Sequence, residues 1–170
     1  MLKNCKFWIL VGLLLFSLSG CAETALHNKP SGEVAGEICN PVDEDVGCET
    51  MVDEVIQLTN EYRVSHGLPP LEKDETLCDV AEIRAKEIVE TWSHVRPDGT
   101  KFYNILFDMN YEMRAAGENL GRYQSSAEEV LNMWKQSESH NKNMLSEYTK
   151  MGAAVYEHDG KLHFVQIFAR

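Results

Sequence analysis

Apolar residues recur at helical spacing between Leu77 and Trp92, and this is the clearest pattern in the chain. Spacings of three, four and seven residues place these side chains on one side of a helix. Arg84 falls within the stripe, where its stem can lie along apolar surface or its guanidinium can pair with an acid. Asp74 precedes the stripe at a position suited to an N-cap. The stripe consists of Leu77, Val80, Ala81, Arg84, Ala85, Ile88, Val89 and Trp92.

Three further helices are predicted from shorter patterns. One runs from about Glu49 to His66, and a short one covers residues 102–110. The last begins at Ser126, because Ser126 and Glu129 have the spacing of a capping box. The expected buried residues of the first and last of these helices are Val52, Val55, Ile56, Thr59, Tyr62, Val130, Leu131 and Trp134.

The pattern changes to strands after Lys150. Residues 151–157 and 161–169 are strand-like runs, and the Asp159-Gly160 pair between them is typical of a hairpin turn. In the second run both alternating faces carry apolar residues, which indicates a strand that is covered on both sides. The sequence therefore predicts an α+β fold in which a small antiparallel sheet lies between helices.

The N-terminal segment has the features of an export signal. Lys3 and Lys6 precede an apolar run over residues 7–18, which is shorter than the roughly 20 residues that a membrane-spanning helix needs. Small residues then lead into Cys21, in the pattern of a lipobox. We expect residues 1–20 to be removed and Cys21 to carry lipid, so that the domain is anchored to a membrane outside the cytoplasm. The alternative is ordinary signal cleavage, with Cys21 incidental.

Composition separates a tether from a globular domain. Residues 21–47 contain glycine, proline and several acids without apolar periodicity, which is typical of a flexible tether behind the lipidated cysteine. Residues 48–170 are long enough for one domain with its own core. The formal net charge of −11 argues against nucleic-acid binding, which needs clustered lysine and arginine.

The remaining cysteines fit an exported protein. Cys39, Cys48 and Cys78 allow one disulfide, for which Cys39–Cys48 is the simplest pairing, although spacing leaves Cys78 open as a partner of either. The sequence contains no Cys-x-x-Cys motif, so neither thiol-redox chemistry nor a cysteine zinc site is expected.

Polar residues collect in three segments that we expect to be loops or loop-flanking. The sequence has no G-x-S-x-G, H-E-x-x-H, phosphate-binding or dinucleotide-binding motif. Instead, the residues that a core does not explain lie around Ser93-His94, in Gly117-Glu118-Asn119, and in the run His140-Asn141-Lys142-Asn143.

These segments resemble the motifs of one known family. Asn60-Glu61-Tyr62-Arg63 and the following His66-Gly67-Leu68-Pro69-Pro70-Leu71 are similar to the first helix and turn of the CAP superfamily. This superfamily includes the cysteine-rich secretory proteins, antigen 5 and pathogenesis-related 1 proteins. The segments around His94, Glu118 and His140 resemble three further motifs, in the family's order. The resemblance implies a bacterial SCP-like extracellular domain, an α-β-α sandwich with a surface cleft.

The resemblance also implies which residues line the cleft. His94, His140 and Glu118 match two histidines and one glutamate of the family, and some members bind a divalent metal there. The position of the family's second glutamate is Ser137 in this chain, and Glu138 is the next residue. Two imidazoles and a carboxylate suit Zn²⁺ or a similar ion. The same trio could act without metal as an acid or base, or could only order its own loops.

Two functions follow from this sequence. The first is a non-enzymatic module of the cell envelope that binds an ion or an envelope or extracellular ligand through the cleft. The second is a metal-dependent hydrolase of peptide or cell-wall substrates. The absence of a nucleophile–base pair and of the second glutamate favours the first.

Overall fold

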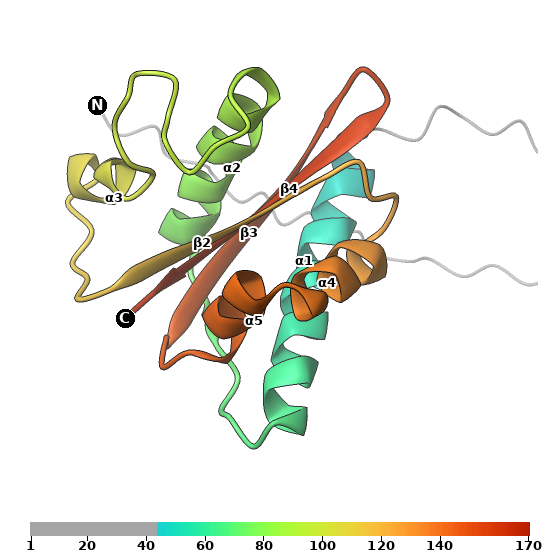
Figure 1. The fold of residues 1–170 in the computed structure, drawn as a ribbon, viewed down its shortest axis with the longest axis vertical. Coiled ribbons are helices and arrows are strands. Elements are labelled where there is room, and N and C mark those ends of the chain that lie inside the picture. The colour runs from blue at the N-terminus through green and yellow to red at the C-terminus, as the bar shows by residue number, and fades with distance from the viewer. Residues whose placement is uncertain (1–43) are drawn as a thin grey trace, which may run out of the picture. The chain divides into compact units, whose positions relative to one another are not determined.

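The computed structural model describes residues 44–170, with side chains from residue 47 (Figure 1). The export signal, Cys21 and Cys39 lie outside these residues, so lipidation, the tether and the Cys39–Cys48 pairing stay predictions. Cys78 forms no disulfide with another residue of the described part of the chain. Among the described helices, none combines the length and apolar character needed to span a membrane.

Four strands form one sheet in the order β1-β3-β4-β2. The strands are β1 (Glu72–Lys73), β2 (Ala116–Arg122), β3 (Lys150–His158) and β4 (Lys161–Ala169). β4 pairs antiparallel with both β2 and β3, whereas the two-residue β1 pairs parallel with β3. Asp159 and Gly160 have φ angles of 51° and 69°, as the predicted two-residue hairpin turn requires.

Helices cover both faces of the sheet. They are α1 (Glu44–Ser65), α2 (Glu75–Glu90), α3 (Asn104–Asp108), α4 (Ala127–Gln136) and α5 (Glu138–Leu145). α1, α4 and α5 pack together on one face, and α2 and α3 lie on the other (Figure 1). The predicted α+β fold, an α-β-α sandwich, is therefore confirmed.

The central strand β4 contributes to a core on each side. Phe164 and Phe168 pack with α1, α4 and α5, while Val165 and Ile167 pack with α2 and α3. All four side chains are fully buried. The apolar residues on both faces of β4 are therefore explained by burial on both sides of the sheet, as the sequence predicted.

Both predicted N-caps are present. The carboxylate of Asp74 accepts a hydrogen bond from the Leu77 amide at 3.1 Å, and the hydroxyl of Ser126 accepts one from the Glu129 amide at 3.2 Å. The capping box differs in one detail, because the Glu129 carboxylate accepts from the amide of Ser125 rather than from that of Ser126.

Helix boundaries differ from the sequence prediction in three places. α1 begins at Glu44, before the predicted Glu49. The short α3 spans Asn104–Asp108 only. α2 ends at Glu90, so Trp92 lies outside the stripe and is 42% exposed.

Two predictions near the site are wrong. Gly117-Glu118-Asn119 lies on β2 rather than in a loop, because both polar side chains find partners inside the protein. The run His140-Asn141-Lys142-Asn143 lies on a separate helix, α5, rather than in a loop. Ser137 has the extended backbone angles φ −94° and ψ 119°, so it ends α4 and precedes a separate helix, α5.

Candidate functional site

The site lies along β2, which is an edge strand of the sheet. Successive side chains of a strand point to opposite faces. Glu118 therefore points toward α2, while Asn119 points toward α5. The segment that carries His94 contacts β2 from the α2 face, and the segment that carries His140 contacts it from the α5 face.

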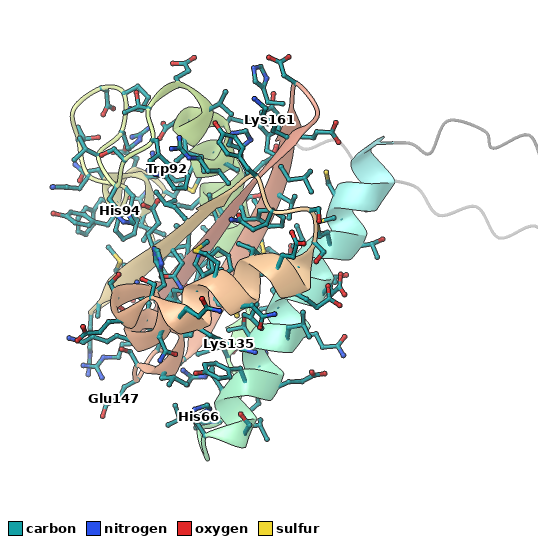
Figure 2. The ribbon with its side chains drawn as sticks, turned by 45° about the vertical axis from the view of Figure 1, so that its right-hand side comes forward. His66, Trp92, His94, Lys135, Glu147 and Lys161 are labelled. Atoms are coloured by element: carbon teal, nitrogen blue, oxygen red, sulfur yellow. The ribbon has the colours of Figure 1, made fainter. Side chains whose placement is uncertain are left out.

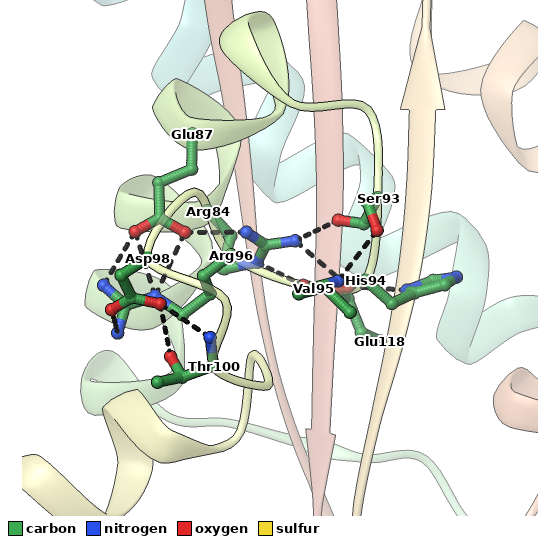
Figure 3. A network of polar contacts seen from close by, with 9 residues as sticks. All are labelled: Arg84, Glu87, Ser93, His94, Val95, Arg96, Asp98, Thr100 and Glu118. Carbon is green, nitrogen blue, oxygen red and sulfur yellow. Dashed lines mark hydrogen bonds and ion pairs between the residues drawn. The ribbon is translucent and has the colours of Figure 1, made fainter.

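Glu118 is buried and both its oxygens are occupied (Figure 3). Arg84 Nε donates to Glu118 Oε1 at 2.7 Å, and the side chains of both residues are fully buried. His94 Nδ1 lies 2.6 Å from Glu118 Oε2. The carboxylate thus holds a guanidinium on one side and an imidazole on the other.

Arg84 makes the centre of a larger polar network (Figure 3). Its Nη1 donates to Glu87 at 2.6 Å, and its Nη2 donates to the carbonyl of Ser93 at 2.6 Å. Burial alone would lower the pKa of Arg84, but its hydrogen bonds and charge contacts with Glu118 and Glu87 raise it. The net effect is a raised pKa, so the guanidinium stays charged.

A second arginine fixes the loop that carries His94. Arg96 donates to Glu87 at 2.7 Å. Burial alone would raise the pKa of Glu87, but its hydrogen bonds and charge contacts with Arg96 and Arg84 outweigh burial and lower the pKa. Asp98 accepts from the amide and hydroxyl of Thr100 and closes the turn. The loop is therefore held by hydrogen bonds at both ends.

His94 is presented to solvent by this network. Its side chain is 56% exposed although its partner Glu118 is fully buried. Since Nδ1 faces the carboxylate, Nε2 is the nitrogen left for a ligand. Figure 2 shows His94 far from His66 at the end of α1, so His66 does not belong to this site.

Asn119 connects the same strand to α5. Its side-chain amide donates to the carbonyl of His140 at 3.1 Å and to Gln166 at 3.1 Å. Asn143 of α5 donates to the carbonyl of Glu118 at 3.1 Å and to the side chain of Asn119 at 2.9 Å. Two adjacent residues of β2 thereby fix the positions of both histidines.

The network continues through the sheet to α1. Gln166 on β4 donates to the hydroxyl of Thr59 at 2.7 Å, and Thr59 in turn donates to the carbonyl of Val55 at 2.7 Å. Gln166 and Thr59 have no exposed surface. Buried polar groups with satisfied hydrogen bonds favour one arrangement of their segments, because any other arrangement leaves them without partners.

His140 is half-buried and neutral. Burial lowers its pKa, and the charge of His94 lowers it further. Its Nδ1 is buried and has no hydrogen-bond partner in the described part of the chain. An N–H at that position would be left without an acceptor, so we assign the ring proton to Nε2.

Glu138 lies apart from these groups. It is the first residue of α5, is exposed, and makes no hydrogen bond or ion pair with another described residue. The neighbouring Ser137 hydroxyl lies 3.3 Å from that of Ser139. The geometry therefore joins His94 and Glu118 directly, brings His140 near them, and leaves Glu138 outside.

The residues present do not fit a three-ligand metal site. Both oxygens of Glu118 already accept hydrogen bonds from Arg84 or His94, so the carboxylate is engaged by these two partners. Residues 44–170 contain no group of three histidine, cysteine or acidic side chains suited to holding a metal. Glu118 instead orients His94, as carboxylates commonly orient histidines.

The sequence reasoning missed the residues that support the site. Arg84 was expected to snorkel or pair with an acid, and the pairing is confirmed, but its partner was not identified. Asn119 and Asn143 were noted only as loop residues. A charged residue within an apolar stripe was the one available signal, because a buried charge needs a partner from elsewhere in the chain.

Comparison with known proteins is consistent across sequence and structure. Residues 56–168 match the model of the cysteine-rich secretory protein family, CAP. Uncharacterized protein YkwD of Bacillus subtilis is 32% identical over 107 residues, which are 61% of this chain and 42% of that protein. The chain therefore spans less than half the length of that curated relative.

Two solved structures have a similar fold. A crystal structure of an extracellular protein with an SCP domain, from Bacillus anthracis, has a TM-score of 0.69 and 29% identity. The alignment covers 77% of this chain and 45% of that one. An outer surface protein of Borrelia burgdorferi has a TM-score of 0.67 and 23% identity, over 72% of this chain and 93% of that one.

Proposed function

Because the chain belongs to the cysteine-rich secretory protein family, we propose that it is an exported envelope protein whose domain binds a ligand without transforming it. The ligand would contact the edge of β2 between His94 and His140. The family has an extracellular member in Bacillus anthracis, and export of this chain is part of the proposal.

The fixed position of His94 is the observation that carries this proposal. An exposed imidazole on a loop normally rotates freely, but here its Nδ1 lies 2.6 Å from a fully buried carboxylate. Burying Glu118 and Arg84 costs several kcal/mol per ion before their attraction is counted. A network that holds one exposed ring in a defined position favours recognition at that ring.

The two histidines offer complementary hydrogen-bonding groups. In the tautomer of His94 that has its proton on Nδ1, facing Glu118, Nε2 is an acceptor, whereas His140 with its proton on Nε2 has a donor. A ligand with adjacent donor and acceptor atoms, such as a hydroxyl or an amide, suits this pair. Amides and hydroxyls are the main polar groups of peptides and amino sugars, so an envelope polymer is the ligand class that we propose.

Binding can be tested by following the histidine rings directly. The probes are a tripeptide amide, an oligomer of N-acetylated amino sugar, and Zn²⁺ alone, each added to isotopically labelled protein. We expect one of the organic probes to shift the ring resonances of both His94 and His140. The variant His94→Ala should remove the response. The variant His66→Ala, which changes a histidine just after α1 and far from His94, should retain it. No ring shift with any of the three probes would contradict the proposal.

The hydrolase hypothesis is the second candidate. An imidazole oriented by a carboxylate is also what general-base catalysis needs. Among the described serines, threonines and cysteines, none donates a hydrogen bond to His94 or His140, so water would have to be the nucleophile. Mass spectrometry of each probe after incubation separates the two functions. An unchanged mass supports a binding module, and cleavage that is lost in His94→Ala supports a hydrolase.

A further inference from the structure

A groove of about 940 Å³ lies along β3, at the other edge of the sheet from the histidines. Its floor is the outer edge of β3 from Ala153 to Glu157. α1 forms one wall and α2 forms the other, and the two helices lie on opposite faces of the sheet (Figure 1). The groove has no residue in common with the histidine site.

The floor of the groove is an unpaired strand edge. β1 covers only the start of β3, where the carbonyls of Thr149 and Met151 accept from the amides of Glu72 and Asp74. Backbone groups of alternate residues face the same side of a strand, so those of Val155 and Glu157 also point outward. In the described residues these outward groups have no hydrogen-bond partner. Such an edge is a template for another extended segment.

The walls of the groove carry an excess of negative charge. Six of the lining residues are acids and two are lysines: Glu49, Asp53, Glu75, Asp79, Glu82 and Glu157, with Lys73 and Lys86. Lys73 lies 3.0 Å from Asp53, and Lys86 lies 2.5 Å from Glu82. Glu49 on α1, Asp79 on α2 and Glu157 on β3 form no ion pair within the described part of the chain. Unpaired carboxylates therefore occur on both walls and on the floor.

We propose that this groove binds an extended, lysine- or arginine-containing peptide segment of a partner protein, which adds a strand beside β3. Main-chain hydrogen bonds to Val155 and Glu157 supply affinity, in the manner of strand addition in other peptide-binding domains. The side chains of an added strand alternate between the α1 wall and the α2 wall, so basic residues reach acids on both sides. Ala153 and Ala154 at the start of the floor are buried, so the accessible edge runs from Val155 to Glu157 and pairs with about three residues of the segment, roughly 10 Å of strand.

Charge distinguishes this occupant from the chain's own upstream segment. Residues 22–43, which precede α1 in the chain, contain four acids and one lysine. Placing these acids between Glu49, Asp79 and Glu157 would bring like charges together, which disfavours binding. A basic partner gains instead from the same carboxylates.

The test uses a synthetic peptide, acetyl-Lys-Val-Lys-Val-Lys-Val-amide, and the full chain in a neutral detergent. We expect saturable binding by fluorescence polarisation, with amide resonance shifts at Val155 and Glu157. Asp79→Lys combined with Glu157→Lys should weaken binding at least tenfold. The matched control, Glu90→Lys combined with Glu112→Lys, changes the same charge on exposed residues outside the groove and should bind like the unmodified chain.

A third variant separates strand pairing from charge attraction. Val155→Pro removes one outward N–H on an edge that tolerates proline, and should weaken binding while the charge stays constant. Circular dichroism establishes that this variant is folded before binding is measured. The proposal is overturned by absence of binding, by equal loss in the two charge variants, or by unchanged binding of a folded Val155→Pro. It is also overturned if the peptide binds only after deletion of residues 22–43, since the upstream segment would then be the occupant.

Discussion

Arg84 Nε and Glu118 Oε1 lie 2.7 Å apart between two side chains with no exposed surface. The charges of this pair compensate each other, and removal of either leaves a buried charge without its partner. Arg84→Met should therefore lower the free energy of unfolding by about 3–5 kcal/mol. Urea denaturation of the purified domain gives this number directly.

A double variant provides the control for this pair. Arg84→Met combined with Glu118→Leu removes both charges and should be less destabilised than Arg84→Met alone, because no buried charge is left uncompensated. If the loss of unfolding free energy in the double variant equals the sum of the losses in Arg84→Met and Glu118→Leu, the two side chains act independently, which contradicts the pairing.

Acid should destabilise the fold through the half-buried His140 and the buried His163. Burial lowers the pKa of His140 and of His163, and the charge of His94 contributes at His140. In the unfolded chain both titrate near 6.5. Between that value and the lowered folded pKa the unfolded state binds more protons, so stability should fall as pH decreases from 7.5 to 5.5.

The slope of this pH dependence is what checks the prediction. His140→Asn combined with His163→Asn should flatten the dependence of the unfolding free energy on pH over the same range, whatever its effect at pH 7.5. Equal slopes for the variant and the unmodified protein would assign the acid sensitivity to other groups.

Gly152 is a position where no side chain fits. A Cβ there would lie 2.2 Å from the Cys78 nitrogen and 2.2 Å from the Leu77 carbonyl carbon, both of which are backbone atoms of α2. Because backbone cannot rotate away, Gly152→Ala should cost about 3 kcal/mol or more of stability. Thermal denaturation measures the loss.

Gly47 in α1 is the matched control for Gly152. A Cβ at Gly47 has no atom within 4 Å, and its backbone is helical. Gly47→Ala should be neutral or should stabilise by about 0.5–1 kcal/mol, as alanine does in a helix interior. A comparable loss in both variants would mean that α2 does not pack on β3 at this point.

The lipobox prediction concerns the N-terminal segment. Cys21→Ser should move the protein from the membrane fraction to the soluble fraction, because the acyl chains that hold it would be absent. Cell fractionation and intact mass measurement check this together. Membrane retention of the variant, with no lipid mass on the unmodified protein, would contradict lipidation.

Sequence patterns predicted the parts of this fold in which apolar periodicity is unbroken. The stripe of α2 and the two-sided run of β4 are both present, because burial of those side chains is itself what the pattern reports. β2 was missed, since Ala116–Arg122 contains two glycines and two buried polar residues instead of an apolar alternation. The separate helix α5 was missed as well, because no glycine or proline before it marks where a new helix begins.

The candidate site was only partly predictable for a physical reason. His94 and Glu118 come from separate segments, and the resemblance to a family suggested that they meet, as they do. The hydrogen bond between Arg84 and Glu118 depends on where the fold places α2 relative to β2, which no local sequence pattern reports. Because Glu118 is bound by Arg84, its carboxylate orients the ring of His94, and the ring rather than the carboxylate faces a ligand.

The adjacent buried residues Glu118 and Asn119 also determine how β2 can join the sheet. A strand with little apolar alternation is ordinarily free to slip by one position against its neighbour. A slip here would turn Glu118 toward Asn143 and Gln166, which offer no positive charge, and would place Asn119 opposite the guanidinium of Arg84. An alignment shifted by one residue thus buries an uncompensated ion, so the polar pair disfavours a slip that hydrophobicity alone would tolerate.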